Sequence, residues 1–259
     1  FNFYFARPSF ISDNTGDIES TVADFTPAVI NHRYDLTMNI GGPVTRDKVW
    51  FFAGYQFFNE NFRNPGVQFD QTEDSDRFFG KVTWQANQNN RVIVSAMADT
   101  YTLGGRPGGA RVEPAATVDE PSMNITPNVT WNSVLSPDAF LEVKYSGFYG
   151  FFDLIPISNT AAYDDWGDGW LREAYWGYYT FDRNRTALQA NLSYYLEDLG
   201  GDHSFKFGTR SWSRTTSPST GRPRRAASST ASSSSTIRTT VSRTLHTSST
   251  RSSTGTPAR

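Results

Sequence analysis

Alternation of apolar and polar residues with a period of two is the feature that most restricts the fold of this chain. Leu188, Ala190 and Leu192, for example, alternate with Gln189 and Asn191. Comparable alternation begins near residues 34, 77, 92, 123 and 141, in segments of roughly 10 to 14 residues. Helical spacing fits none of these segments. The pattern therefore predicts antiparallel strands that have one apolar face and one polar face.

The connections between these segments alternate in length. Short connections rich in turn-forming residues lie at 41–48, 87–90, 136–139 and 199–202, and long polar connections lie near 8–31, 61–74, 103–120 and 154–182. Short turns on one rim and long loops on the other are typical of transmembrane β-barrels of the bacterial outer membrane. Because two turns on one rim are separated by two crossings, we expect Leu171–Phe181 to extend a loop and not to form a crossing of its own.

A soluble β-sandwich is the alternative fold for such strands, and two features of the sequence argue against it. The segments approach the ~9–11 residues of a tilted membrane crossing. Aromatic residues also gather near the expected strand ends, as in the girdles of membrane barrels. They are Trp50, Phe51, Phe52, Phe57, Phe58, Phe78, Phe79, Trp84, Trp131, Phe151 and Phe152. The sequence thus predicts an all-β fold: an antiparallel transmembrane β-barrel meander of eight or nine strands, part of a larger barrel.

Composition divides the chain near residue 212. Every Phe, Tyr and Trp lies at or before Trp212, and residues 1–212 carry 16 basic and 26 acidic side chains. Residues 213–259 contain 14 Ser, 12 Thr and 8 Arg but no acidic residue. We expect a partial barrel over 1–212 and a low-complexity tail over 213–259, either disordered or the product of a frame error in a GC-rich gene. Resequencing the locus decides between these two origins.

Two motifs resemble a known family. The segment Asn39–Tyr55, with Gly41, Gly42 and Pro43 expected to form a tight reversal, resembles the barrel of TonB-dependent outer-membrane receptors. Within that family it is similar to the Oar-like branch, whose chains carry a carboxypeptidase-regulatory-like domain ahead of the plug. The segment His203–Gly208 is similar to a strand that follows a Gly-rich periplasmic turn in these receptors.

The resemblance implies energy-coupled import of a scarce extracellular ligand across the bacterial outer membrane. Its implied partners are outer-membrane lipid, a plug domain inside a 22-stranded barrel and a TonB-type energy-coupling complex. We find no plug, energy-coupling box or C-terminal aromatic strand, so we expect the chain to be a barrel fragment. A passive or structural barrel, porin-like or adhesive, would share the strands and remains the alternative.

Motifs for catalysis were sought and not found. The sequence lacks a nucleophile elbow, a phosphate-binding loop, a dinucleotide fingerprint and a His-Glu-x-x-His pattern. Its three histidines, at 32, 203 and 246, have no metal-site spacing, and there is no cysteine. We therefore expect no enzyme activity, no cofactor and no resident metal. The net charge of −2 gives no basis for nucleic-acid binding.

One acidic and aromatic loop is the best candidate for ligand contact. It holds Asp164, Asp165, Trp166, Asp168 and Trp170. Carboxylates can gather a hard cation such as calcium, and indole rings can stack on a sugar or an aromatic group. The spacing does not match an EF-hand, and an ordinary solvated extracellular loop explains the same residues. If the loop does bind, its charge favours a cation-bearing, sugar-like or peptide ligand.

Overall fold

The computed structural model describes residues 1–12, 16, 26–196, 203–220 and 236–245. Ten strands form one antiparallel sheet in the order β1-β2-β3-β4-β5-β6-β7-β10-β11-β12, and β8 and β9 form a separate two-stranded sheet. The elements are β1 Asn2–Ala6, the 3-10 turn η1 Pro8–Phe10, β2 Val29–Thr45, β3 Val49–Arg63, β4 Gln71–Asn87, β5 Asn90–Arg106, η2 Pro114–Ala116, β6 Val118–Ser136, β7 Ala139–Pro156, β8 Tyr163–Asp165, β9 Trp170–Arg172, β10 Tyr179–Leu196, β11 His203–Thr220 and β12 Thr236–Leu245.

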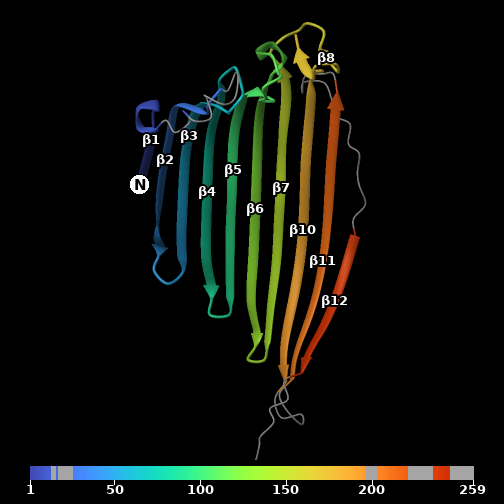
Figure 1. The fold of residues 1–259 in the computed structure, drawn as a ribbon. Helices are drawn as coiled ribbons and strands as arrows, with labels where there is room; N and C mark the ends of the chain where they lie inside the picture. The colour runs from blue at the N-terminus through green and yellow to red at the C-terminus, as the bar shows by residue number, and fades with distance from the viewer. Residues whose placement is uncertain (13–15, 17–25, 197–202, 221–235, 246–259) are drawn as a thin grey trace, which may run out of the picture.

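The sheet is a meander, in which strands lie side by side in chain order (Figure 1). Short turns line its lower edge in that view and longer connections line its upper edge. The turns step downward from β2–β3 to β6–β7, a stagger of the kind that accompanies strand tilt in barrels. The predicted antiparallel meander is confirmed. Nine of its strands begin within residues 1–212, as expected, and the tenth lies beyond.

The strands are longer than the alternation indicated. Those from β2 to β11 in the main sheet have 15 to 19 residues, and the connections shrink accordingly to 64–70, 107–117 and 157–178. Backbone pairing continues toward the loops where both faces have become polar, so the alternation fades before the hydrogen bonds end. Leu171 lies in β9, outside the main sheet, which confirms that the predicted stretch adds no separate crossing, although Tyr179–Phe181 opens β10.

The turn after β2 corrects one expectation. Gly41, Gly42 and Pro43 lie within β2 and pair with residues of β3, so they do not make the reversal. The chain turns at residues 46–48, where Asp47 has φ 60°. An aspartate tolerates this left-handed conformation better than most residues do. The turns predicted at 87–90 and 136–139 are confirmed, and the one at 199–202 lies outside the described residues.

The expected boundary at residue 212 does not end the sheet. Strand β11 continues to Thr220, and Thr236–Leu245 forms β12, whose Thr236 is paired with Trp212. The expectation of a tail without regular structure therefore fails for these two segments. Strand pairing requires only backbone groups and extended conformation, which Ser- and Thr-rich sequence can supply. The frame-error origin of 213–259 stays a prediction.

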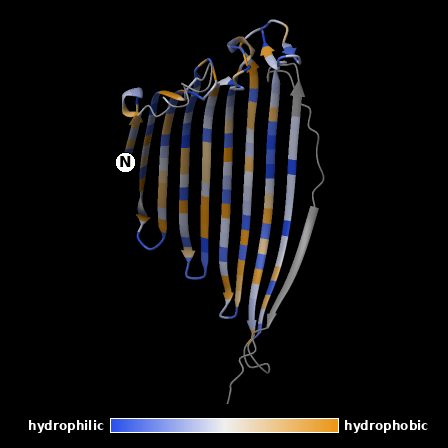
Figure 2. Ribbon diagram, in the orientation of Figure 1, coloured by the Kyte–Doolittle hydropathy of each residue, from blue (hydrophilic) through white to orange (hydrophobic). Residues whose placement is uncertain are grey.

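The pairing register gives the sheet one apolar and one polar face. The row Val82, Val94, Val129, Tyr145 and Leu188 crosses five strands on the apolar face. The row of next neighbours, Lys81, Ser95, Asn128 and Ser146, lies on the opposite face. In Figure 2 the coloured strands show alternating hydrophilic and hydrophobic bands along their length. Many apolar side chains are exposed, among them Val82 at 45% and Val94 at 46%.

Two rows of residues bound the apolar band. Trp84, Val92 and Trp131 are aligned near the short turns, and Asp76, Thr100 and Met123 are aligned toward the loops. Trp84 and Asp76 are eight residues apart, about 26 Å along the strand, or ~20 Å after a tilt of ~40°. This approaches the ~25 Å apolar band of a membrane barrel. Trp84 and Trp131 thus occupy expected girdle positions, whereas Phe78 and Phe79 lie in the middle of β4 and not at its end.

Candidate functional site

The connections on the long-loop rim pack against one another. The loops at 107–117 and 157–178 are joined by a parallel bridge between Val112 and Leu171. The Glu113 N–H donates to the Leu171 carbonyl at 3.0 Å, and the Leu171 N–H donates to the Arg111 carbonyl at 2.9 Å. A small core lies beneath, formed by Ala116, Thr117, Val118, Leu171 and Ala174, all buried. The candidate loop is therefore held on a packed base.

Within the second loop, β8 and β9 form a hairpin that contains all five predicted contact residues. The Asp165 carboxylate accepts from the Gly167 N–H at 2.9 Å, and the Asp168 carboxylate accepts from the Trp170 N–H at 2.9 Å. The Gly169 N–H donates to the Asp165 carbonyl at 2.7 Å, with φ 72° at Gly169. Glycine adopts that conformation without strain. Asp165 and Asp168 thus build the turn, as aspartates commonly do.

Asp168 also belongs to an ion-pair chain that fastens the hairpin. Its other carboxylate oxygen lies 2.8 Å from Arg172, and Arg172 lies 3.2 Å from Glu113 in the neighbouring loop. Burial opposes ionisation of Asp168, but hydrogen bonds from Trp170 N–H and Arg172 and the nearby positive charges outweigh it, so its pKa is lowered. The hydrogen bond to Asp168 raises the pKa of Arg172. Burial opposes this rise, and the contact with Glu113 adds to it.

The indole rings of the hairpin have different surroundings. The Arg172 guanidinium lies 4.8 Å from the centroid of the Trp170 ring, so one face of that ring is occupied. Trp166 at the hairpin tip is 91% exposed, and Asp164 is exposed as well. Trp166 and Asp164 are therefore the residues most accessible to a ligand. Among the described residues, no group of three or more His, Cys, Asp or Glu side chains is placed to hold a metal ion.

The polar face of the main sheet carries several ion pairs, some of which join neighbouring strands. Arg33 pairs with Glu60 and Arg106 with Glu120 across neighbouring strands, whereas Lys144 pairs with Glu142 of its own strand at 2.8 Å. Arg77 pairs with Glu73 of its own strand at 3.4 Å, and Lys81 lies on the same face. The register places Arg77, Lys81, Glu142 and Lys144 together on this polar face.

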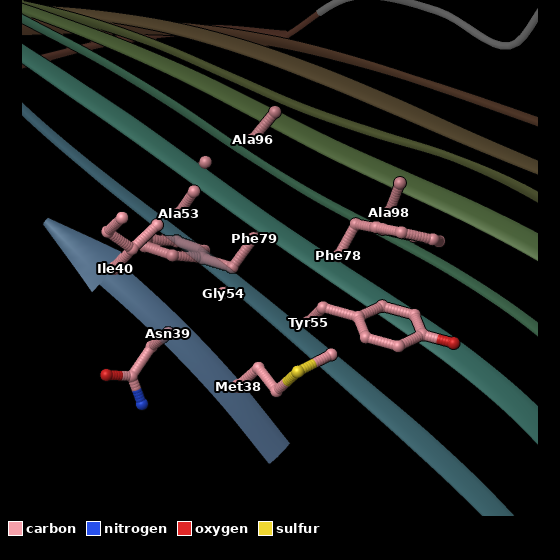
Figure 3. A pocket seen from close by; sticks show the side chains of 11 residues that line it. Met38, Asn39, Ile40, Ala53, Gly54, Tyr55, Phe78, Phe79, Ala96 and Ala98 are labelled. Atoms are coloured by element: carbon pink, nitrogen blue, oxygen red, sulfur yellow. The ribbon is translucent and has the colours of Figure 1, made fainter. Parts of the chain in front are cut away.

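The apolar face has a shallow depression that the sequence did not reveal. Small residues of adjacent strands, Ala53, Gly80, Ala96 and Ala98, lie between the larger Met38, Ile40, Tyr55 and Phe78 (Figure 3). Its volume is about 550 Å³. Because the lining is almost wholly apolar and the depression lies within the apolar band, it suits hydrocarbon rather than a polar solute. No helix within the described part of the chain is long and apolar enough to span a membrane.

Comparisons with solved structures identify the fold. The chain is similar to the outer membrane transporter YddB from Escherichia coli, at 11% identity and a TM-score of 0.52, over 72% of this chain and 26% of that one. It is also similar to BauA, the ferric preacinetobactin receptor from Acinetobacter baumannii, at 14% identity and a TM-score of 0.56, over 83% of this chain and 32% of that one. No family model matches the chain, and no curated protein matches it.

These similarities agree with the two-faced meander. The chain has the fold of an antiparallel outer-membrane β-barrel wall, and its sheet does not close on itself within the described residues. It spans about a quarter to a third of the length of the two receptors that it matches. At 11% and 14% identity the likeness concerns the fold and carries over no binding residue.

Proposed function

We propose that the chain forms part of the barrel wall of a TonB-dependent receptor that imports a scarce ligand across the bacterial outer membrane. The observation that carries the proposal is the two-faced sheet, whose apolar band between the Trp84 row and the Asp76 row approaches the thickness of a membrane. The long, mutually packed loops on one rim support it, since receptors of this kind meet their ligand with such loops. The resemblance of Asn39–Tyr55 to the Oar-like branch supports the narrower assignment.

A passive or structural barrel is the second candidate, because it would share the strands, the band and the loops. The two differ in what fills the lumen, since a transporter has a plug and a porin has an open aqueous channel. The proposal therefore includes a plug domain and an energy-coupling partner for the complete receptor.

The expected result for the complete gene is a signal peptide, an energy-coupling box and a plug ahead of the barrel. The matching measurement is conductance of the full-length protein in planar bilayers. A plugged transporter should give little steady current, and removal of the plug should raise it. Large stepwise conductance from the intact protein, with a signal peptide leading straight into strands, would instead establish the passive barrel.

The β8–β9 hairpin is the proposed ligand contact within this function. Trp166 and Asp164 are exposed, and changing them leaves the Asp165 and Asp168 turn contacts in place. We expect Trp166→Ala combined with Asp164→Asn to weaken binding of the transported ligand about fivefold or more in the full-length receptor, roughly 1 kcal/mol. Tyr163→Ala is the matched control, since Tyr163 is equally part of the hairpin and 54% exposed. Affinities within about twofold for the double variant would exclude this hairpin as the site.

A further inference from the structure

The polar face of β10 and β11 differs from the rest of that face in its charge. Arg183 and Arg185 lie on this face of β10, because each is an even number of residues from Gln189. Arg210 of β11 lies on the same face, because it is paired with Gln189. Arg185 is directly opposite Arg214, so two like charges face one another across the strands. Like charges directly opposite one another on neighbouring strands repel.

Within the described part of the chain, carboxylates do not pair with Arg183, Arg185 or Arg210, although they pair with four of the basic side chains on β2 to β7. On the described strands β2 to β7, Arg33, Arg77, Arg106 and Lys144 each have a carboxylate partner within ion-pair distance. Among the described residues, no ion pair involves Arg183, Arg185 or Arg210. Glu120 lies within electrostatic range of Arg183 but pairs with Arg106, and Glu142 pairs with Lys144.

Two hollows coincide with this unbalanced charge. One has a volume of about 590 Å³ and is lined by Phe148, Arg183, Arg185, Trp212, Arg214 and neighbouring residues. The other has a volume of about 510 Å³ and is lined by Gln189, Asn191, Arg210 and again Arg185 and Trp212. Since both are lined by Arg185 and Trp212, they are adjacent along β10 and β11, and we call the two hollows together the arginine groove. Among the residues that the structure describes, no acidic side chain lines either hollow.

The lining matches one class of ligand chemistry. A guanidinium offers paired N–H donors that fit a carboxylate or phosphate. The Gln189 amide donates one hydrogen to Asn191, and the Asn191 amide donates one to Glu142, so each has one further N–H to offer. The half-buried rings of Trp212 and Phe148 offer flat apolar surfaces beside those charges. One face of the Phe152 ring is already covered by Arg183 at 4.7 Å, which fixes that side chain near the groove.

We infer that the arginine groove binds an organic oxyanion that carries a flat ring next to its carboxylate or phosphate group. The inference goes beyond the proposed transport function, because it requires only that water reach the polar face and needs neither a plug nor energy coupling. Arg183, Arg185, Arg210 and Trp212 carry it, and all four precede the change of composition after residue 212.

The test is binding of phenyl phosphate to the full chain in uncharged detergent at low ionic strength, followed by broadening of the phenyl proton signals in NMR. Inorganic phosphate lacks the ring and phenol lacks the charge, so each should bind more weakly than phenyl phosphate. We expect Arg185→Gln and Arg210→Gln each to weaken phenyl phosphate binding roughly tenfold. Trp212→Leu should weaken phenyl phosphate but leave inorganic phosphate unchanged.

Arg91→Gln is the matched control. Arg91 is an exposed arginine on the same polar face, without an ion-pair partner among the described residues, but it does not line the groove. It should change the affinity less than twofold. An equal loss in Arg91→Gln would show attraction to overall charge and overturn the proposal. Wild-type affinity in both groove variants, with circular dichroism confirming intact strands, would overturn it as well. Equal binding of phenyl and inorganic phosphate would overturn the role of the rings.

Discussion

Replacing Val129 by arginine is expected to destabilise the membrane-inserted sheet by ~1–3 kcal/mol, between the ~2–4 kcal/mol that a cation costs at the bilayer midplane of a β-barrel and the ~0–1 kcal/mol that it costs near the interfaces. Val129 lies on the apolar face, where it is paired with Val94 on one side and Tyr145 on the other. It is one step along the same face from Trp131 in the girdle row, so a long arginine side chain can partly reach the interface, and the cost should stay below that at the midplane. The measurement is unfolding by urea in lipid vesicles, followed by tryptophan fluorescence.

The neighbouring residue supplies the control. Asn128 points to the opposite face, where its partners are Ser95 and Ser146. Asn128→Arg adds the same charge one position away and should cost less than ~1 kcal/mol, because lumen-facing positions accept charge. Val129→Ala separates the loss of packing from the charge. Equal destabilisation by the two arginine variants would contradict the assignment of faces, and with it the membrane orientation of the whole sheet.

Strand type, strand order and the faces of the sheet could be predicted from the sequence because each depends on local alternation. Leu188 to Asn191 alternate as the register requires, and the parity of the short turns correctly excluded a separate crossing by Leu171. Strand length could not be predicted in the same way. Glu73 and Asp74 lie within β4, although the sequence around them predicts a polar loop. The backbone pairing of the strand extends beyond the residues that alternate between apolar and polar.

The candidate site divides in a similar way. The sequence placed Asp165, Asp168 and Trp170 in one loop. It did not predict the turn hydrogen bonds of the two aspartates or the stacking of Arg172 on Trp170. Arg172 is in turn bonded to Glu113, which is 59 residues away along the chain, so its position could not be read from the loop sequence alone. The arginine groove was missed because its charges come from two strands whose register is not visible in either segment alone. Arg183 and Arg185 on one strand were themselves a readable signal.

The ion pair between Arg106 and Glu120 should respond very differently to loss of each partner. The Glu120 side chain is only 6% exposed, whereas the Arg106 side chain is 49% exposed. Arg106→Met leaves a buried carboxylate without its cation, and we expect a loss of ~2–4 kcal/mol in unfolding free energy. Glu120→Gln leaves a neutral amide in the same space and an arginine that water can reach, so its cost should stay below ~1 kcal/mol.

The double variant isolates the reason for that asymmetry. If the cost of Arg106→Met comes from the stranded charge, adding Glu120→Gln should restore much of the lost stability, because no buried carboxylate is left. Acidification should likewise narrow the deficit of Arg106→Met, since protonation removes the same charge. Urea unfolding of the wild type, the two single variants and the double variant measures all four states. Additive costs, or a greater loss in Glu120→Gln than in Arg106→Met, would mean that packing of the arginine stem and not desolvated charge sets the stability at this end of β5 and β6.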